Sequence, residues 1–418
     1  MLFNFVMALR YMDTVPLGDQ LGYESIAIAI LHGKSTSDYY NQDGFPDIGM
    51  VVTPVYSAII ATVYMVFGEK PAAVYILQIL MNLFIVLIFY YLLKKFSNSI
   101  FAFSVSVFLS FYYVLWRMNF SLMMEISSIL FLFVIAYFTF RFLQNFNKKE
   151  FFIITVLWSL LIFMNNRFIV HFCILYLFWS IIFLINRKFP IQNQVYAAII
   201  LIFVLLPWHI RQYTVYERFV IFKPLRTGFL NPDLVGKFMG DEIKSAKEFK
   251  SYEYYIEHVK DATIRPENKK KFLKEFTIEK YNELKNRFES RTRFDRYLLN
   301  FFENFRITRT KISLSGGVDS RITPPASKIH NTVNLLFLAP AFFLFPLGLF
   351  YSFKNRSLFF ISLIVIVFSN ILVHTMLFCL DRYRLLTVPF IFLISAYGLY
   401  QLFFNYRMNK KIKMLTVQ

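Results

Sequence analysis

Long runs of apolar residues alternate with short polar segments along most of the chain. Nine runs are read as membrane crossings, and all but the run at 151–164 come close to the roughly 20 residues that a crossing needs. They lie at residues 71–93, 98–116, 120–140, 151–164, 168–186, 193–210, 331–353, 357–380 and 385–405. Residues 1–10 add the end of a further, truncated span. Backbone groups in lipid must be bonded within their own segment, and these runs lack the apolar–polar alternation of barrel strands. The pattern therefore predicts an all-α polytopic bundle of about ten spans.

Basic residues in the short loops predict the orientation of the bundle. They fall at alternate connections: Lys94, Lys95, Arg141, Lys148, Lys149, Arg187, Lys188, Lys354, Arg356 and the tail from Arg407. Lys and Arg accumulate on the cytoplasmic side of membranes, so these loops define the cytoplasmic face. The apolar segment 54–67 would break the alternation if it crossed, and it is short for a span. It is predicted to be an interfacial or re-entrant helix on the opposite face.

One long polar segment, residues 211–330, interrupts the apolar pattern and holds 41 of the 71 charged residues. Its composition is typical of amphipathic helices outside the membrane. We therefore expect three parts. They are an N-terminal transmembrane region at 1–210 with a first extracytoplasmic loop at 10–53, an extracytoplasmic insertion at 211–330, and C-terminal transmembrane helices with a basic cytoplasmic tail at 331–418.

Composition excludes an ordinary soluble enzyme. Of the 418 residues, 57% are hydrophobic and only 17% are charged, whereas soluble domains are about a quarter charged. The net charge of +19 follows the predicted topology and does not indicate nucleic acid binding. Cys173 and Cys379 lie in or beside apolar runs, so both are predicted to be small buried hydrophobes without redox chemistry.

Five polar segments converge on the face opposite the basic loops. They are residues 10–53, 117–125, the NNR at 165–167, the PWHIR at 207–211 and the DRYR at 381–384. Ionisable groups near the hydrocarbon boundary are costly, so they usually pair, line a wet cavity or bind a ligand. Their convergence predicts a functional site on this face.

Carboxylates in the first loop supply one kind of chemistry. The loop carries Asp13, Asp19, Glu24, Asp38, Asp43 and Asp47. A carboxylate can remove a proton from an acceptor hydroxyl, or hold a divalent cation beside a phosphate. The loop contains no DxD pair or His cluster. No cofactor is therefore expected, and a role for a divalent metal stays open.

Arginines near helix ends could bind phosphate. Arg211, Arg382 and Arg384 are placed to bind a lipid phosphate through guanidinium forks, with interfacial anchoring as the alternative for each. Glu125 begins an apolar helix, where pairing with Arg117 or Arg167 and a role in the site are both open.

Six pieces of the sequence form a pattern when taken in order. They are GDQLGYESIAIAILHGK at 18–34, TPVYSAIIATVYMVFG at 53–68, Glu125 after a short polar loop, NNR at 165–167, PWHIRQYTVYERFV at 207–220 and RYRLLTVPF at 382–390. The series resembles the GT-C fold membrane glycosyltransferases, especially bacterial proteins like protein O-mannosyltransferases and the lipid A aminoarabinose transferase. Protein O-mannosyltransferases have an acidic pair where this chain has Asp19 followed by Gln20.

The resemblance implies an inverting transfer of a sugar from a polyprenyl-phosphate donor to an envelope lipid, glycan or protein at the outer face of a bacterial inner membrane. It implies Asp19 as the catalytic base. The expected substrate-binding residues are Tyr23, Glu125, Arg167, Arg211, Arg382 and Arg384. Two alternatives stay open, a ligase or polymerase of lipid-linked oligosaccharides and a transporter or flippase. The few charges in mid-span and the unlike halves of the chain weigh against the transporter.

Overall fold

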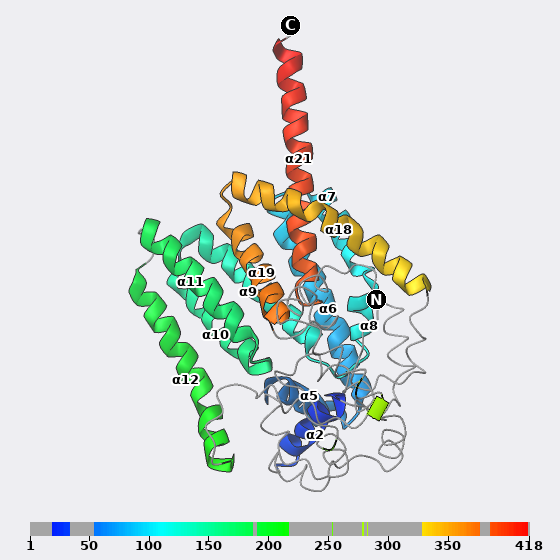
Figure 1. Ribbon diagram of the computed structural model, residues 1–418, viewed down its shortest axis with the longest axis vertical. Coiled ribbons are helices and arrows are strands. Elements are labelled where there is room, and N and C mark those ends of the chain that lie inside the picture. The colour runs from blue at the N-terminus through cyan, green and yellow to red at the C-terminus, as the bar shows by residue number, and fades with distance from the viewer. Residues whose placement is uncertain are drawn as a thin grey trace.

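The computed structural model describes residues 19–33, 54–186, 190–216, 328–376 and 385–416, with four isolated helical residues at 253, 278, 279 and 282. All regular structure in these ranges is helical (Figure 1), which confirms the all-α prediction. The helices are α2 (Asp19–Leu31), α5 (Pro54–Phe67), α6 (Pro71–Lys94), α7 (Ser99–Ser110), α8 (Tyr113–Met118), α9 (Glu125–Asn145), α10 (Lys148–Met164), α11 (Phe168–Asn186), α12 (Ile191–Tyr216), α18 (Lys328–Lys354), α19 (Leu358–Met376) and α21 (Val388–Thr416).

Six of the described helices are long and apolar enough to cross a membrane, namely α6, α9, α11, α12, α18 and α19. These six correspond to six of the nine apolar runs. The other three runs form shorter apolar helices: α7, the 17-residue α10 and the Val388–Phe404 part of α21. The fold is thus a multi-pass helical membrane protein. The truncated span predicted at residues 1–10 lies outside the described residues.

The prediction of a single span at 98–116 is wrong, because this run forms two helices, α7 and α8. It begins at Asn98, whose side chain accepts the backbone N–H of Phe101 and caps α7. It then breaks at residues 111–112, and the chain resumes as the short α8. The sequence has no Pro or Gly from 98 to 118, so local propensity does not cause the break. Instead Tyr112 is buried beside Phe337 and Phe392, at ring distances of 6.5 and 6.2 Å. Packing against α18 and α21 sets the break.

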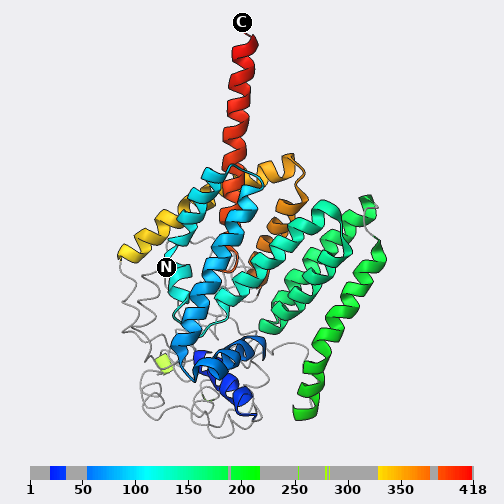
Figure 2. The ribbon, with the colours of Figure 1, turned by 180° about the vertical axis from the view of Figure 1, so that it is seen from behind.

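The two ends of the bundle differ in character, and Figures 1 and 2 show both. Helices α2 and α5 lie across the lower end of the bundle, while the C-terminal part of α21 projects beyond the upper end. The ends of α6, α9 and α18 that carry Lys94, Arg141 and Lys354 lie towards the upper end, which we call the basic end. The lower end is called the α2–α5 end below. As predicted, the short helix at 54–67 lies at the end opposite the basic loops.

Close backbone contact holds the C-terminal helices together. A Cβ at Gly348 of α18 would meet the carbonyl of Ile394, and one at Gly398 of α21 would meet the backbone of Gly348. Ser395 donates a hydrogen bond to the carbonyl of Ala341, at 2.6 Å. Small residues let helices in a membrane approach this closely and gain van der Waals contact. These glycines therefore fix the crossing of α18 and α21.

Buried polar contacts tie α11 to α19. Asn370 Oδ1 lies 3.2 Å from Nε2 of both His171 and His374, and Asn370 Nδ2 lies 3.5 Å from the hydroxyl of Thr387. All four side chains are buried. Polar groups removed from water need such partners, so the network stabilises this pairing of helices. It also agrees with a packing role for His374.

The prediction for the cysteines is wrong at Cys173, which is exposed on α11. Helix α11 is long and apolar enough to cross a membrane, and an exposed position on such a helix tolerates a small apolar side chain. Cys379 lies outside the described residues.

Candidate functional site

Helix α2 is fixed to the turn that precedes α9 by one buried hydrogen bond. Gln20 Oε1 accepts the backbone N–H of Leu122 at 2.9 Å, and both residues are buried. Asp19 is the first residue of α2, directly before this anchor; its side chain lies outside the described part. Gln20 thus carries a structural amide at the start of α2. Sequence reasoning noted the departure at Gln20 but did not find this role.

The turn itself is held from α6. Gln78 Nε2 donates to the carbonyl of Ser121 at 2.8 Å and to that of Asn119 at 3.4 Å. Ser121 donates to the carbonyl of Met118. All four residues are buried. Because main-chain groups of an irregular segment need partners in an apolar setting, Gln78 allows this turn to exist inside the protein.

Tyr23 of α2 contacts both α5 and the residue that precedes α9. Its hydroxyl donates to Met124 Sδ at 3.3 Å, and its ring meets Tyr56 edge to face, with centroids 5.1 Å apart. Tyr56 is buried, and its hydroxyl has no hydrogen-bond partner among the described residues. Tyr56 was not predicted as a site residue, although it is the Tyr of the TPVY segment quoted above.

Glu125 is buried as the first residue of α9, with 1% of its surface exposed. The partial positive charge of a helix N-terminus favours a carboxylate there. Burial raises the pKa of Tyr56 well above its ordinary value, and the nearby Glu125 carboxylate raises it further. Tyr56 therefore keeps its proton and can donate it in a hydrogen bond. The structure brings Tyr23 and Glu125 together around Met124 and Tyr56.

A second carboxylate pairs α2 with α5. Tyr64 donates a hydrogen bond to Glu24 Oε1 at 2.7 Å. Burial raises the pKa of Glu24; the hydrogen bond from Tyr64 lowers it, and Glu69 adds a smaller rise. Burial and this hydrogen bond also raise the pKa of Tyr64. Glu24 thus belongs to the contact between α2 and α5. The sequence alone indicated only that it is one of the acids of the first loop.

Arg167 lies after α10, near the start of α9. Ser128, one turn into α9, donates to Sδ of Met164 in the last turn of α10. Asn165 Oδ1 accepts the backbone N–H of Arg167, and Nδ1 of His171 lies 3.2 Å from the Arg167 carbonyl oxygen. The loop backbone is thus fixed at both ends, and the arginine side chain is partly buried. Arg167 and Glu125 therefore lie at neighbouring helix ends.

Of the other arginines predicted to bind substrate, the structure describes Arg211 but not Arg382 or Arg384. Arg211 lies on α12, which packs against α10 and α11, and its guanidinium lies 4.9 Å from the Trp208 ring. A guanidinium over an indole face is stabilised by the ring quadrupole. Arg382 and Arg384 lie outside the described residues, as do the first-loop acids beyond residue 33. Among the described residues, no group of three or more His, Cys, Asp or Glu could hold a metal ion.

One protein family matches the part of the chain that holds most of these elements. Residues 51–210 match the family of dolichyl-phosphate-mannose-protein mannosyltransferases. The matched region runs from α5 to α12 and includes the turn before α9, Glu125 and Arg167. It covers less than half of the chain, and Asp19 precedes it. No curated protein matches the chain. The match implies a membrane glycosyltransferase that uses a lipid-linked sugar donor.

Proposed function

We propose that this chain is an inverting glycosyltransferase of a bacterial inner membrane. In this proposal it moves a sugar from a polyprenyl-phosphate donor to an envelope lipid, glycan or protein at the outer face. The family match over residues 51–210 is the observation that carries the proposal. Further support comes from the α2–α5 end, where polar side chains are gathered opposite the basic end.

Asp19 is assigned as the catalytic base. It begins α2 beside the Gln20–Leu122 anchor and one turn before Tyr23, whose hydroxyl contacts Met124. A general base must be held within hydrogen-bond reach of the proton it removes. Anchoring α2 by a buried bond at its first turn supplies such positioning.

The reaction is a single displacement at the anomeric carbon of the sugar. The acceptor oxygen attacks this carbon while its proton passes to the Asp19 carboxylate. The bond from the carbon to the phosphate oxygen breaks, and its electron pair leaves with the polyprenyl phosphate. Attack opposite the leaving group inverts the configuration.

The leaving phosphate gains negative charge, and cationic groups aimed at it lower the barrier. We assign this role to Arg167 and Arg211 together with Arg382 and Arg384. Tyr23 and Glu125 are assigned to the sugar, whose hydroxyls suit a phenol and a buried carboxylate. Tyr56 is added as a donor of a hydrogen bond at the same place, because its buried hydroxyl has no described partner.

Sugar transfer by the purified chain in liposomes tests the proposal. The probe is polyprenyl-phosphate mannose, with membrane extract from a strain that lacks the protein as the acceptor source. Mass spectrometry measures the released polyprenyl phosphate and the glycosylated product. Asp19→Asn keeps the size of the side chain and removes the base, so turnover should fall by about 100-fold or more. Glu69→Gln is the matched control, because Glu69 is a half-exposed carboxylate paired with His32 at 2.8 Å.

Each alternative function gives a different result. Wild-type turnover in Asp19→Asn would remove the base assignment. Movement of intact lipid-linked sugar across the bilayer without phosphate release would identify a flippase. Loss of a whole glycan chain from the deletion strain, in place of one sugar, would identify a ligase or polymerase.

A further inference from the structure

An aromatic pair with two cations above it lies at the basic end, between α6 and α9. The rings of Tyr91 and Tyr137 have centroids 5.5 Å apart. Lys95 Nζ lies 4.9 Å from the Tyr91 ring, and Arg141 Cζ lies 5.9 Å from the Tyr137 ring. Both cations therefore flank the same aromatic pair, which we call the Tyr91–Tyr137 patch.

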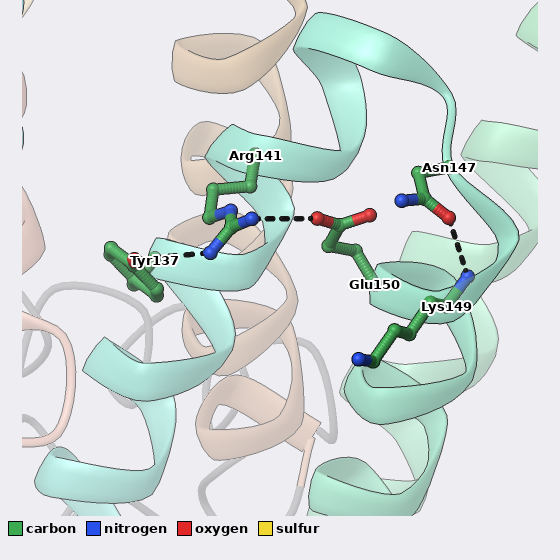
Figure 3. A network of polar contacts seen from close by, with 5 residues as sticks. All are labelled: Tyr137, Arg141, Asn147, Lys149 and Glu150. Atoms are coloured by element: carbon green, nitrogen blue, oxygen red, sulfur yellow. Dashed lines mark hydrogen bonds and ion pairs between the residues drawn. The ribbon is translucent and has the colours of Figure 1, made fainter.

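A buried carboxylate orients the arginine of this patch (Figure 3). Arg141 Nη2 lies 3.1 Å from Glu150 Oε1, and Nη1 lies 3.5 Å from the Tyr137 hydroxyl. The Glu150 side chain is 7% exposed and that of Arg141 is 48% exposed. The guanidinium has five N–H donors, and these two contacts use only part of them. The exposed part of Arg141 is thus held in place, and its remaining N–H donors can bind a further acceptor.

The cations of this corner outnumber its acids. Lys94 and Lys95 are exposed at the end of α6, and among the described residues neither forms an ion pair. Of the two acids from residue 71 to residue 150, Glu150 is paired with Arg141 and Glu125 lies at the other end of α9. An anion bound at the patch would meet the Lys95 ammonium and an oriented guanidinium, with the Lys94 ammonium over the neighbouring Tyr90 ring. This combination of cations matches a phosphate.

Below the cations, α6 presents an apolar stripe to its surroundings. Leu80, Phe84, Leu87 and Tyr91 are all exposed, and their spacing of four, three and four residues places them on one helix face. At 1.5 Å per residue the stripe is about 16 Å long, close to the length of an acyl chain. An anion site that continues into an apolar stripe matches a lipid better than a soluble phosphate.

We propose that one anionic phospholipid binds at this corner. Its phosphate lies between Lys95 and Arg141 over the Tyr91–Tyr137 patch, and one acyl chain follows the stripe of α6. The site lies at the end of the bundle opposite the catalytic site, so it does not depend on the sugar-transfer proposal.

Native mass spectrometry of the full chain in detergent tests this site. The chain is titrated with phosphatidylglycerol or with phosphatidylcholine, and the first bound lipid is counted. We expect tighter binding of phosphatidylglycerol. A variant with Lys94→Gln and Lys95→Gln should weaken it by about tenfold, because each basic residue near a membrane surface contributes to anionic lipid binding. Arg141 is left intact, since its removal would strand the buried Glu150 carboxylate.

A double variant with Lys354→Gln and Arg356→Gln is the matched control. It removes the same charge from the same end, and both residues are exposed. It should change the affinity by less than about threefold. Equal binding of the two lipids would overturn the proposal, as would equal losses in both variants. A dimer that Phe84→Ala dissociates would also overturn it, because a second copy would then cover the stripe.

Discussion

The bond between Gln20 and Leu122 should decide how firmly α2 is held at the site. Replacing Gln20 by Met keeps the length of the side chain but removes the acceptor of the 2.9 Å hydrogen bond. Gln20 is 4% exposed and Leu122 is fully buried, so water cannot replace the lost partner. A buried N–H left without an acceptor costs about 1–3 kcal/mol. That cost corresponds to about a 5- to 150-fold shift from docked to undocked α2.

Hydrogen–deuterium exchange with mass spectrometry measures this shift directly. Peptides covering residues 19–31 should exchange about 5- to 150-fold faster in Gln20→Met, because local opening controls their protection. Peptides covering 358–376 should keep the wild-type rate. Gln194→Met is the matched control, since the amide atoms of Gln194 are buried without a hydrogen-bond partner among the described residues. Unchanged protection of α2 in Gln20→Met, or equal loss throughout the chain, would refute the reasoning.

Two further predictions concern stability, measured as thermal unfolding in detergent. Gly398→Ala places a methyl group against the backbone of Gly348, and the overpacking should cost about 1–3 kcal/mol; an unchanged midpoint would show that α18 and α21 do not cross this closely. The pKa of Glu24 is raised from 4.5 by burial, so the folded chain holds this proton more tightly than the unfolded chain. The stabilisation is full below about pH 4.5 and is lost as pH rises through the raised pKa. Glu24→Gln should lack this pH dependence, and the same slope in both proteins would contradict the assignment.

Much of the fold follows from the sequence, because membrane helices must be long, apolar and internally bonded. The runs that became α6, α11 and α19 need no tertiary information. The short helix at 54–67 could be placed because a crossing there would have broken the alternation of basic loops. The break at Tyr112 could not be predicted, because it depends on rings from α18 and α21, more than 200 residues away.

The site was predictable only in part, for the same reason. Motif order indicated Tyr23 and Glu125, and the structure gathers them around Met124. The partner of Gln20 lies 102 residues away, and the partner of Glu24 lies 40 residues away. Nothing in the local sequence distinguishes such a buried anchor from a residue that contacts substrate. Pairing across helices decides which role each polar residue has.

A structure of the chain with bound polyprenyl phosphate tests the central claim most directly. We predict that the phosphate lies at the α2–α5 end, within reach of Asp19 and in contact with at least one of Arg167, Arg211 and Arg384. A phosphate found only at the basic end, beside Lys95 and Arg141, would contradict the catalytic site proposed for this chain.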